Sequence, residues 1–500
     1  MASSYTSNSN GSVWTFQLRQ GVTFSDGTPF NATAVKDSID WEIIAHNGGG
    51  ASSLAAVIPG ANAFLKSNQT QQDVTTFEQN DGITIQSPYS IQFRLAVPFV
   101  SFLAYMGDVY YTYMVSPTAI LAHGGVTPGV GSSWLVSHSA GTGPYVVGSY
   151  NAETGTVVFD KNPSYWAVAQ LGLKQPFNQV TVNVVPNILT EELNVRTGAS
   201  NMMLLPASNF YDFANKTAWT TQNRLVSAVP GTSIWGPYPT ANFYVYMLNT
   251  EMTLPNGTLA KVQPFLNQDM VKAFNYAWNE SYYVQNSLNG LGTVTPGILL
   301  QGEIGYTSFP SPYPFNLTLA QHYIESACAS LGCSKSNPIT IPLYIVNDPA
   351  AESAAAILAS NINSLQAGVS VNVIPGVYDS FLSAFLGKQE GILLGEFNNF
   401  LQDPLVAPLQ FLGDNQNGFG AIFTGYNDTT TLTLLNQAGA ASDITTRSGL
   451  YSQIAQQIAS TGHYIPIAQF DAVVVTSSSI HVVSYNEWLG SYLPTIMELG

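Results

Sequence analysis

The chain has 500 residues, of which 45% are hydrophobic, so it can bury large cores and should form more than one domain. Only 9% are Asp, Glu, Lys or Arg, against about 25% in ordinary soluble proteins. The net charge of -16, without any cluster of Lys and Arg, excludes nucleic-acid binding, which needs cations to neutralise phosphates.

The first third of the chain is predicted to be β-rich, with few helices. Residues 13–19 alternate apolar and polar side chains, as a half-buried strand does, and Asn31 can cap a helix that follows. Residues 83–95 and 144–160 each combine two alternating runs with a central turn signal, which predicts two hairpins.

From about residue 177 the pattern changes to strands separated by helices. Strands are expected near 180–184 and at 242–248, and an amphipathic helix begins near Asn267. The next elements in order are strand 339–346, helix 350–365, strand 369–374, helix 378–387 and strand 391–395. This alternation predicts βαβ units with a parallel sheet. A helix at 447–460 and strands at 464–470 and 472–477 come last.

The chain has two cysteines, Cys328 and Cys333, five residues apart. Outside a cell this pair is expected to close a small disulfide loop at a helix end, and two buried free thiols are the alternative. The six histidines are scattered and no Cys/His spacing is typical of a zinc site. We therefore expect neither a metal nor a cofactor. No apolar run reaches the roughly 18 residues of a membrane span.

Several motifs occur in the order that one protein family shows. Residues 14–30 read WTFQLRQGVTFSDGTPF, followed by a helix pattern at 32–39. Gly141-Thr142-Gly143-Pro144-Tyr145, Asn162-Pro163, Tyr165-Trp166, the helix at 267–279 and Asp403-Pro404 come next. With these motifs the chain resembles the extracellular solute-binding proteins of ABC importers of the peptide/nickel type (family 5). The similarity extends over nearly the whole chain.

The resemblance implies an α/β fold with two lobes, the periplasmic-binding-protein-like fold of type II, cluster C, with an additional small β-rich domain. Residues 1–176 would form the small domain, 177–262 with 477–500 lobe I, and 263–476 lobe II. Family members carry a signal or lipid anchor and a first strand ahead of the segment that corresponds to 13–19. We therefore expect an N-terminally truncated chain of an extracellular or cell-surface protein, associated with the membrane through a segment not present here.

The resemblance also places the ligand region. Peptide binders of the family hold the ligand's amine with an Asp that corresponds to Phe400, and dipeptide binders use an Arg after the strand at 339–346, where this chain has none. A buried cleft without these counter-charges should reject zwitterions, because each unpaired charge costs several kcal/mol. The expected ligand is therefore neutral. An oligosaccharide is favoured, and an oligopeptide with a different amine anchor is the alternative.

Neutral polar ligands are held by amide side chains and aromatic rings. The amides would come from Asn398, Asn399 and Gln402, and the rings from Trp235, Tyr238, Tyr246 and Phe397. Phe400 and Asp403 complete this candidate ligand-binding set, with Asp403 expected mainly to fix its loop. For the segments 397–404 and 235–238, ordinary packing is the alternative interpretation.

The leading hypothesis is a monomer that captures a solute outside the cell and delivers it to an ABC permease, without covalent chemistry. A secreted glycan hydrolase would need paired carboxylates, and the candidates Glu303, Glu396 and Asp403 show no motif. No G-x-S-x-G elbow indicates a serine nucleophile. A surface-layer or adhesion protein is disfavoured by the βαβ pattern at 339–395. We therefore do not expect an enzyme.

Overall fold

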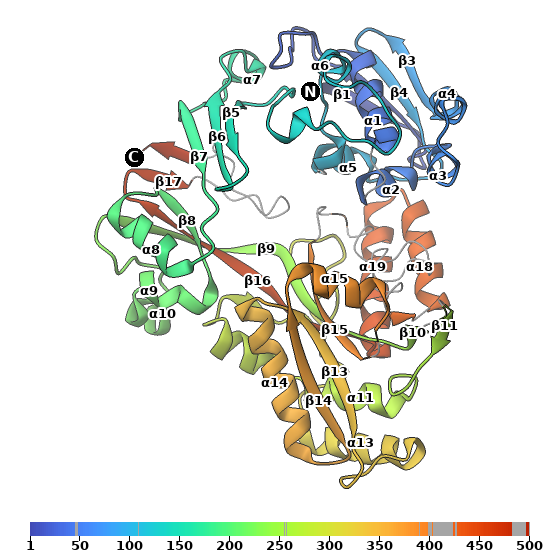
Figure 1. The fold of residues 1–500 in the computed structure, drawn as a ribbon, viewed down its shortest axis with the longest axis vertical. Helices are drawn as coiled ribbons and strands as arrows, with labels where there is room; N and C mark the ends of the chain where they lie inside the picture. The colour runs from blue at the N-terminus through green and yellow to red at the C-terminus, as the bar shows by residue number, and fades with distance from the viewer. Residues whose placement is uncertain are drawn as a thin grey trace.

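The computed structural model describes residues 1–45, 49–108, 110–254, 256, 258–389, 391–398, 403, 424–425, 428–482 and 497–499. Within them lie a seven-stranded sheet, a four-stranded sheet, a three-stranded sheet and two short strand pairs. Figure 1 shows the N-terminal elements at one end of the molecule and the seven-stranded sheet running through the other.

The N-terminal region combines two antiparallel sheets with several helices. Its elements are β1 (Ala2–Ser7), β2 (Val13–Leu18), α1 (Ala32–Ala45), α2 (Gly49–Ala55), α3 (Ala61–Leu65), α4 (Gln71–Asn80), β3 (Ile83–Ser87), β4 (Ser90–Arg94), α5 (Phe102–Asp108), α6 (Pro117–Ala122), β5 (Tyr145–Asn151), β6 (Thr156–Lys161), α7 (Trp166–Leu171) and β7 (Gln179–Val182). Strand β2 buries the alternate residues Trp14, Phe16 and Leu18, as its sequence predicts.

The expectation of few helices in this region was wrong, because α1 to α7 all lie in it. The short helices were missed because they carry little apolar periodicity. Helix α4 buries only Val74 and Phe77, and it begins instead at a capping box between Thr70 and Asp73. Both hairpins, β3–β4 and β5–β6, form where the sequence predicted them.

The rest of the chain surrounds the seven-stranded sheet. Its elements are α8 (Ile188–Thr197), β8 (Met202–Leu205), α9 (Phe210–Phe213), α10 (Lys216–Gln222), β9 (Thr232–Leu248), β10 (Glu251–Thr253), β11 (Leu259–Lys261), α11 (Gln268–Ala277), α12 (Glu280–Tyr282), β12 (Gly292–Thr293), α13 (Leu317–Leu331), β13 (Ile339–Val346), α14 (Pro349–Leu365), β14 (Val369–Gly376), α15 (Tyr378–Leu386), β15 (Ile392–Asn398), α18 (Thr429–Ala440), α19 (Ile444–Thr461), β16 (Tyr464–Ser477), β17 (Ile480–Val482) and β18 (Met497–Leu499).

Two long antiparallel strands, β9 and β16, run through this sheet from the side of β8 and α8 to the side of β13 and β14 (Figure 1). The sequence predicted only 242–248 for the first of them and two separate strands for the second. Register shifts at Pro466/Ala468, Gln469/Asp471 and Ala472/Val474 let β16 bend as one strand. Because β9 and β16 both extend from the side of β8 to the side of β13, the expected lobe boundaries stay predictions.

The predicted βαβ units are confirmed. Strand β13 pairs in parallel with β14 on one side and with β15 on the other, and β15 pairs antiparallel with β9. Helices α14 and α15 connect the parallel strands. Cys328 and Cys333 form the expected disulfide at the end of α13, where Gly332 closes the helix in the left-handed conformation. None of the described helices combines the length and apolarity that crossing a membrane requires.

Candidate functional site

The carboxyl ends of the three parallel strands meet at one edge of the sheet, which we call the carboxyl edge. Val346 of β13 lies opposite Gly376 of β14, and Leu343 of β13 lies opposite Ile392 of β15. Asp348, Tyr378 and Glu396 therefore come to the same edge, although long stretches of sequence separate them. Open α/β sheets bind their ligands outside the carboxyl ends of such strands.

Two acidic side chains, Asp348 and Glu396, repel each other electrostatically at the carboxyl edge. Asp348 caps α14 by accepting hydrogen bonds from the backbone N–H groups of Ala350 (2.9 Å) and Ala351 (3.0 Å). It also accepts a hydrogen bond from the Tyr244 hydroxyl at 2.9 Å. The Glu396 side chain reaches solvent, but partial desolvation at its base, and then the negative charge of Asp348, raises its pKa. The edge is therefore negatively charged.

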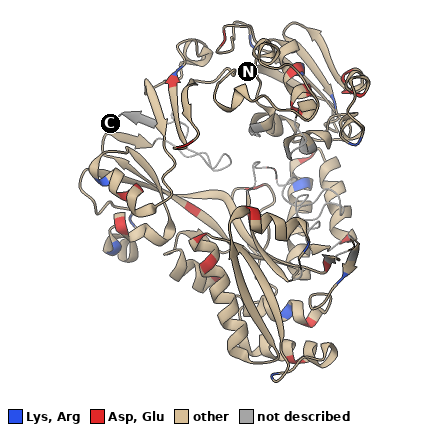
Figure 2. Cartoon of the chain, in the orientation of Figure 1, with Lys and Arg blue, Asp and Glu red and all other residues tan. Residues whose placement is uncertain are grey.

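No cation balances this charge within the described part of the chain, whose ion pairs include neither Asp348 nor Glu396. Lys and Arg are few and lie scattered over the ribbon (Figure 2). A ligand cation placed between the two carboxylates would reduce their repulsion and would lower the pKa of Glu396.

An exposed aromatic ring follows β14 at the same edge of the sheet. Tyr378, the first residue of α15, is 63% exposed, and its ring stacks on Phe381 with centroids 6.5 Å apart. An exposed ring at the end of a parallel strand offers a ligand a flat apolar surface. The sequence analysis did not single out Tyr378, because periodicity assigns it only to a helix start.

The structure separates the residues that were predicted to contact a ligand. Phe397 is 9% exposed and packs against Phe243 of β9, with ring centroids 6.0 Å apart. Asn398 ends β15 opposite Asn242. Both lie at the carboxyl edge by their backbone positions, and their roles stay predictions. Asn399, Phe400 and Gln402 lie outside the described residues.

The predicted residues of β9 have different surroundings. Trp235 and Tyr238 are half-buried, and the Trp235 indole N–H donates to the Thr476 hydroxyl at 2.9 Å. Tyr246 is fully buried, with its ring 5.2 Å from that of Trp278. The sheet is covered on both faces at this point, which explains the almost continuous apolar run of β9 and places the Tyr246 ring in the core.

Asp403 is held inside the protein by residues of two other segments. It accepts a hydrogen bond from the Tyr451 hydroxyl at 2.7 Å and contacts Arg447 and Ser101. Arg447 and Tyr451 lie one turn apart on α19, whereas Ser101 precedes α5 in the N-terminal region. No sequence pattern indicates this network, because Ser101 and Asp403 are 302 residues apart.

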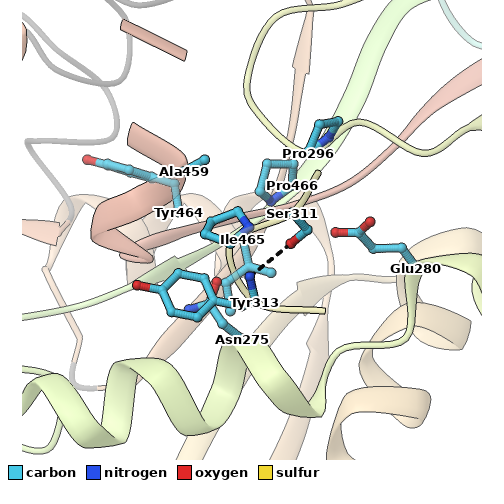
Figure 3. Close-up of a pocket in the computed structure, with 10 residues that line it drawn as sticks. Asn275, Glu280, Pro296, Ser311, Tyr313, Ala459, Tyr464, Ile465 and Pro466 are labelled. Atoms are coloured by element: carbon cyan, nitrogen blue, oxygen red, sulfur yellow. Dashed lines mark hydrogen bonds between the residues drawn. The ribbon is translucent and has the colours of Figure 1, made fainter. Parts of the chain in front are cut away.

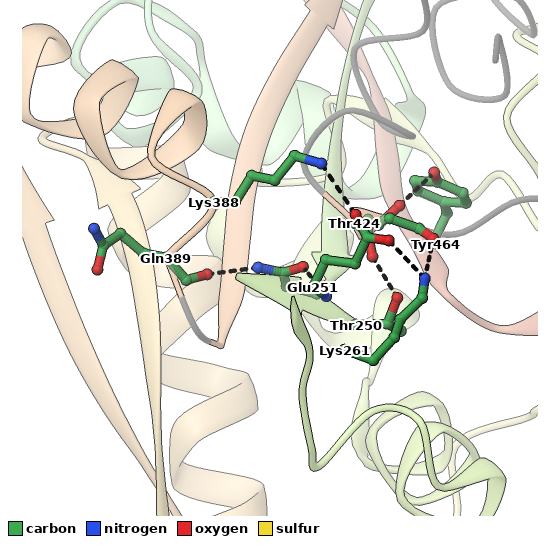
Figure 4. Close-up of polar contacts among 9 residues, drawn as sticks. Thr250, Glu251, Lys261, Lys388, Gln389, Thr424 and Tyr464 are labelled. Atoms are coloured by element: carbon green, nitrogen blue, oxygen red, sulfur yellow. Dashed lines mark hydrogen bonds and ion pairs between the residues drawn. The ribbon is translucent and has the colours of Figure 1, made fainter. Parts of the chain in front are cut away.

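A second ionic cluster surrounds the buried Glu251 (Figure 4). Lys261 lies 2.7 Å and Lys388 3.1 Å from its carboxylate. Burial alone would raise the pKa of Glu251, but the hydrogen bonds from the two lysines lower it below its usual value. These two lysines already have a partner, so we do not count them among candidate ligand groups.

Within the described residues, no group of three or more His, Cys, Asp or Glu side chains is arranged to hold a metal ion. Residues 1–419 match the family described as bacterial extracellular solute-binding proteins, family 5 Middle. The chain belongs to this family. The resemblance in the motifs and the expected fold class are thereby confirmed.

Among curated family 5 proteins, the glutathione-binding protein GsiB of Shigella flexneri is 27% identical over 329 residues, which cover 65% of this chain and 52% of that protein. GsiB of Escherichia coli K12 is 26% identical with the same coverage. The chain thus spans about half the length of the curated relatives it matches.

Solved structures show the same fold at lower sequence identity. The murein tripeptide binding protein MppA of Escherichia coli has a TM-score of 0.76 at 16% identity, covering 100% of this chain and 89% of that one. DppA of Helicobacter pylori, in complex with peptide STSA, has a TM-score of 0.73 at 19% identity, covering 100% and 88%. NikA of Brucella suis, in complex with Fe(III)-EDTA, has a TM-score of 0.74 at 17% identity, covering 100% and 90%.

Proposed function

We propose that the protein is the extracellular solute-binding component of an ABC importer, that it captures a peptide-like solute with a free amine at the carboxyl edge, and that it delivers this solute to a membrane permease. The proposal depends mainly on one observation, the unbalanced carboxylate pair of Asp348 and Glu396. The names of the relatives agree with it, because they include a glutathione-binding protein and a murein tripeptide binding protein.

A primary ammonium suits this pair because it carries one positive charge and three donors. Hydrogen bonds to charged groups contribute about 1.5–3 kcal/mol each, so one such bond to Glu396 would raise affinity about tenfold to hundredfold. The prediction of a neutral ligand rested on two positions only, the Phe at 400 and the missing Arg after 339–346, and did not include this carboxylate pair. Glu396 was named there only as a candidate acid of a hydrolase.

Transport would need no covalent chemistry. The long strands β9 and β16 connect both sides of the seven-stranded sheet, so a ligand that contacts both sides only when they approach favours the closed form. A permease would then recognise the closed shape. An affinity of about 1 μM, equivalent to about 8 kcal/mol, is adequate for such capture.

A neutral oligosaccharide is the second candidate ligand. The exposed Tyr378 ring, which could stack on a sugar, and the 9% content of charged residues favour it. A sugar would leave both carboxylates of the carboxyl edge without a counter-charge, and for this reason we rank it second.

Isothermal titration with a short peptide, its N-acetylated form and a neutral oligosaccharide tests the proposal. We expect the free-amine peptide to bind, and Glu396→Gln to weaken its binding about tenfold or more because a charge-assisted hydrogen bond is lost. Glu352→Gln is the matched control, since Glu352 is an exposed acid in the first turn of α14. Equal binding of the acetylated peptide would contradict the amine anchor, and binding of the sugar alone would contradict the peptide-like ligand.

A further inference from the structure

A small pocket lies in the same half of the molecule as the parallel strands but shares no residue with the carboxyl edge. Its lining comes from α11, α12, the segment that follows β12, the end of α19 and the start of β16 (Figure 3). The polar members are Asn275, Glu280, Ser311, Tyr313 and Tyr464, and prolines and aliphatic residues form the remaining wall. The pocket has room for about one water-sized occupant.

The Glu280 carboxylate points into this pocket (Figure 3). No hydrogen bond or ion pair reaches it from any residue that the structure describes. Burial is the single cause that raises the pKa of Glu280 to about 8. Glu280 is only partly exposed, so its ionised carboxylate has limited contact with water, and a cation in the pocket would stabilise it.

The neighbouring groups can offer oxygen atoms. Both amide hydrogens of Asn275 are used, in hydrogen bonds of 2.8 Å to the backbone oxygens of Val271 and Gly462. Asn275 can therefore offer the pocket only its carbonyl oxygen. The Ser311 hydroxyl accepts a hydrogen bond from the Tyr313 N–H at 3.2 Å and keeps a further lone pair. One carboxylate together with neutral oxygens suits a single positive charge.

We propose that this pocket binds one small monovalent cation, either an alkali-metal ion or an ammonium ion, on the Glu280 carboxylate. A divalent ion would require more carboxylates than this pocket has. The bound ion connects α11 and α12 to the end of α19 and to the first residues of β16. Tyr464, which lines the pocket, also shares a hydrogen bond of 3.0 Å with the Thr424 hydroxyl, next to the Glu251 cluster (Figure 4).

Thermal unfolding of the whole chain at constant ionic strength tests the site. The added salt is the chloride of sodium, potassium, ammonium or tetramethylammonium, the last being too large for a water-sized pocket. We expect at least one of the three small cations to raise Tm by about 2–4 °C over tetramethylammonium. The sodium and potassium arms distinguish an alkali-metal ion from ammonium.

Glu280→Gln keeps the shape of the side chain and removes its charge, so we expect its Tm to be the same in all four salts. Glu325→Gln, at an exposed acid of α13, should keep the response of the unmodified chain. As an independent check, crystals grown in rubidium chloride should show an anomalous peak beside Glu280. Equal Tm values in all four salts, an unchanged response in Glu280→Gln, or a pocket without the peak would each overturn the proposal.

Discussion

Replacing Arg447 with Met is expected to lower the free energy of unfolding by about 3–5 kcal/mol. The Arg447 and Asp403 side chains are only 6% and 5% exposed, so removing the guanidinium takes this cation away from a buried carboxylate. Such a charge is far more unfavourable than a missing surface ion pair. Urea unfolding followed by tryptophan fluorescence measures the effect.

The double variant Arg447→Met with Asp403→Asn is the matched control. It removes both charges, so we expect it to regain part of the stability that the single variant loses. A loss below about 1 kcal/mol in the single variant would show that the network contributes no more than a surface pair does. Because Ser101 belongs to the N-terminal region and Arg447 to α19, the network also connects these two parts of the chain.

The sequence predicted the local elements of this protein better than their extents. The alternation in 339–395 was enough for the parallel strands, because buried strands and Ala-rich helices differ in period. Sequence patterns were insufficient for β9. Its first half has the sequence TSIWGPYPT, and the Gly and Pro residues in it argue against a strand. Pairing with β16 supplies the hydrogen bonds that this segment's own sequence does not predict.

The candidate site was predictable only in part, because its key feature is a juxtaposition. Asp348 was not singled out from the sequence, and Glu396 was named only as a candidate acid of a hydrolase; the structure shows Asp348 as the cap of α14. Only the register of β13 with β15 and the antiparallel crossing of β9 bring the two charges together with Tyr244. The same holds for Glu280, whose lack of a partner among the described residues shows only once five separate segments have packed around it.

The free energy of unfolding is expected to rise as pH falls from 8 toward 5. Burial raises the pKa of Glu280 to about 8, of Glu42 to about 7, and of Asp40 and Asp471 to about 6. Unfolded carboxyl groups titrate near about 4, so in this range the folded protein binds more protons than the unfolded chain. Their stabilising effect is complete below the unfolded pKa and is lost as pH rises through about 6 to 8.

His463 acts in the opposite direction. Burial lowers its pKa to about 4 from 6.5, so its contribution is present above pH 6.5 and is lost as pH falls toward 4. One histidine opposes four carboxyl groups, and net uptake of about one proton between pH 8 and pH 6 corresponds to about 3 kcal/mol. We therefore expect maximum stability in mildly acidic solution.

Urea unfolding between pH 4 and pH 8, in buffers without alkali-metal or ammonium ions, measures this profile. Glu280→Gln should flatten it most between pH 7 and pH 8, because Glu280 is the group that titrates highest. His463→Gln should extend the stable range toward lower pH, since the protonation of His463 no longer favours the unfolded chain. A maximum at pH 8 would mean that the four carboxyl groups are better solvated or paired than their burial implies. In that case Glu280 would lack the unfavourable setting that makes it a candidate cation ligand, so the profile also tests the premise of the proposed cation site.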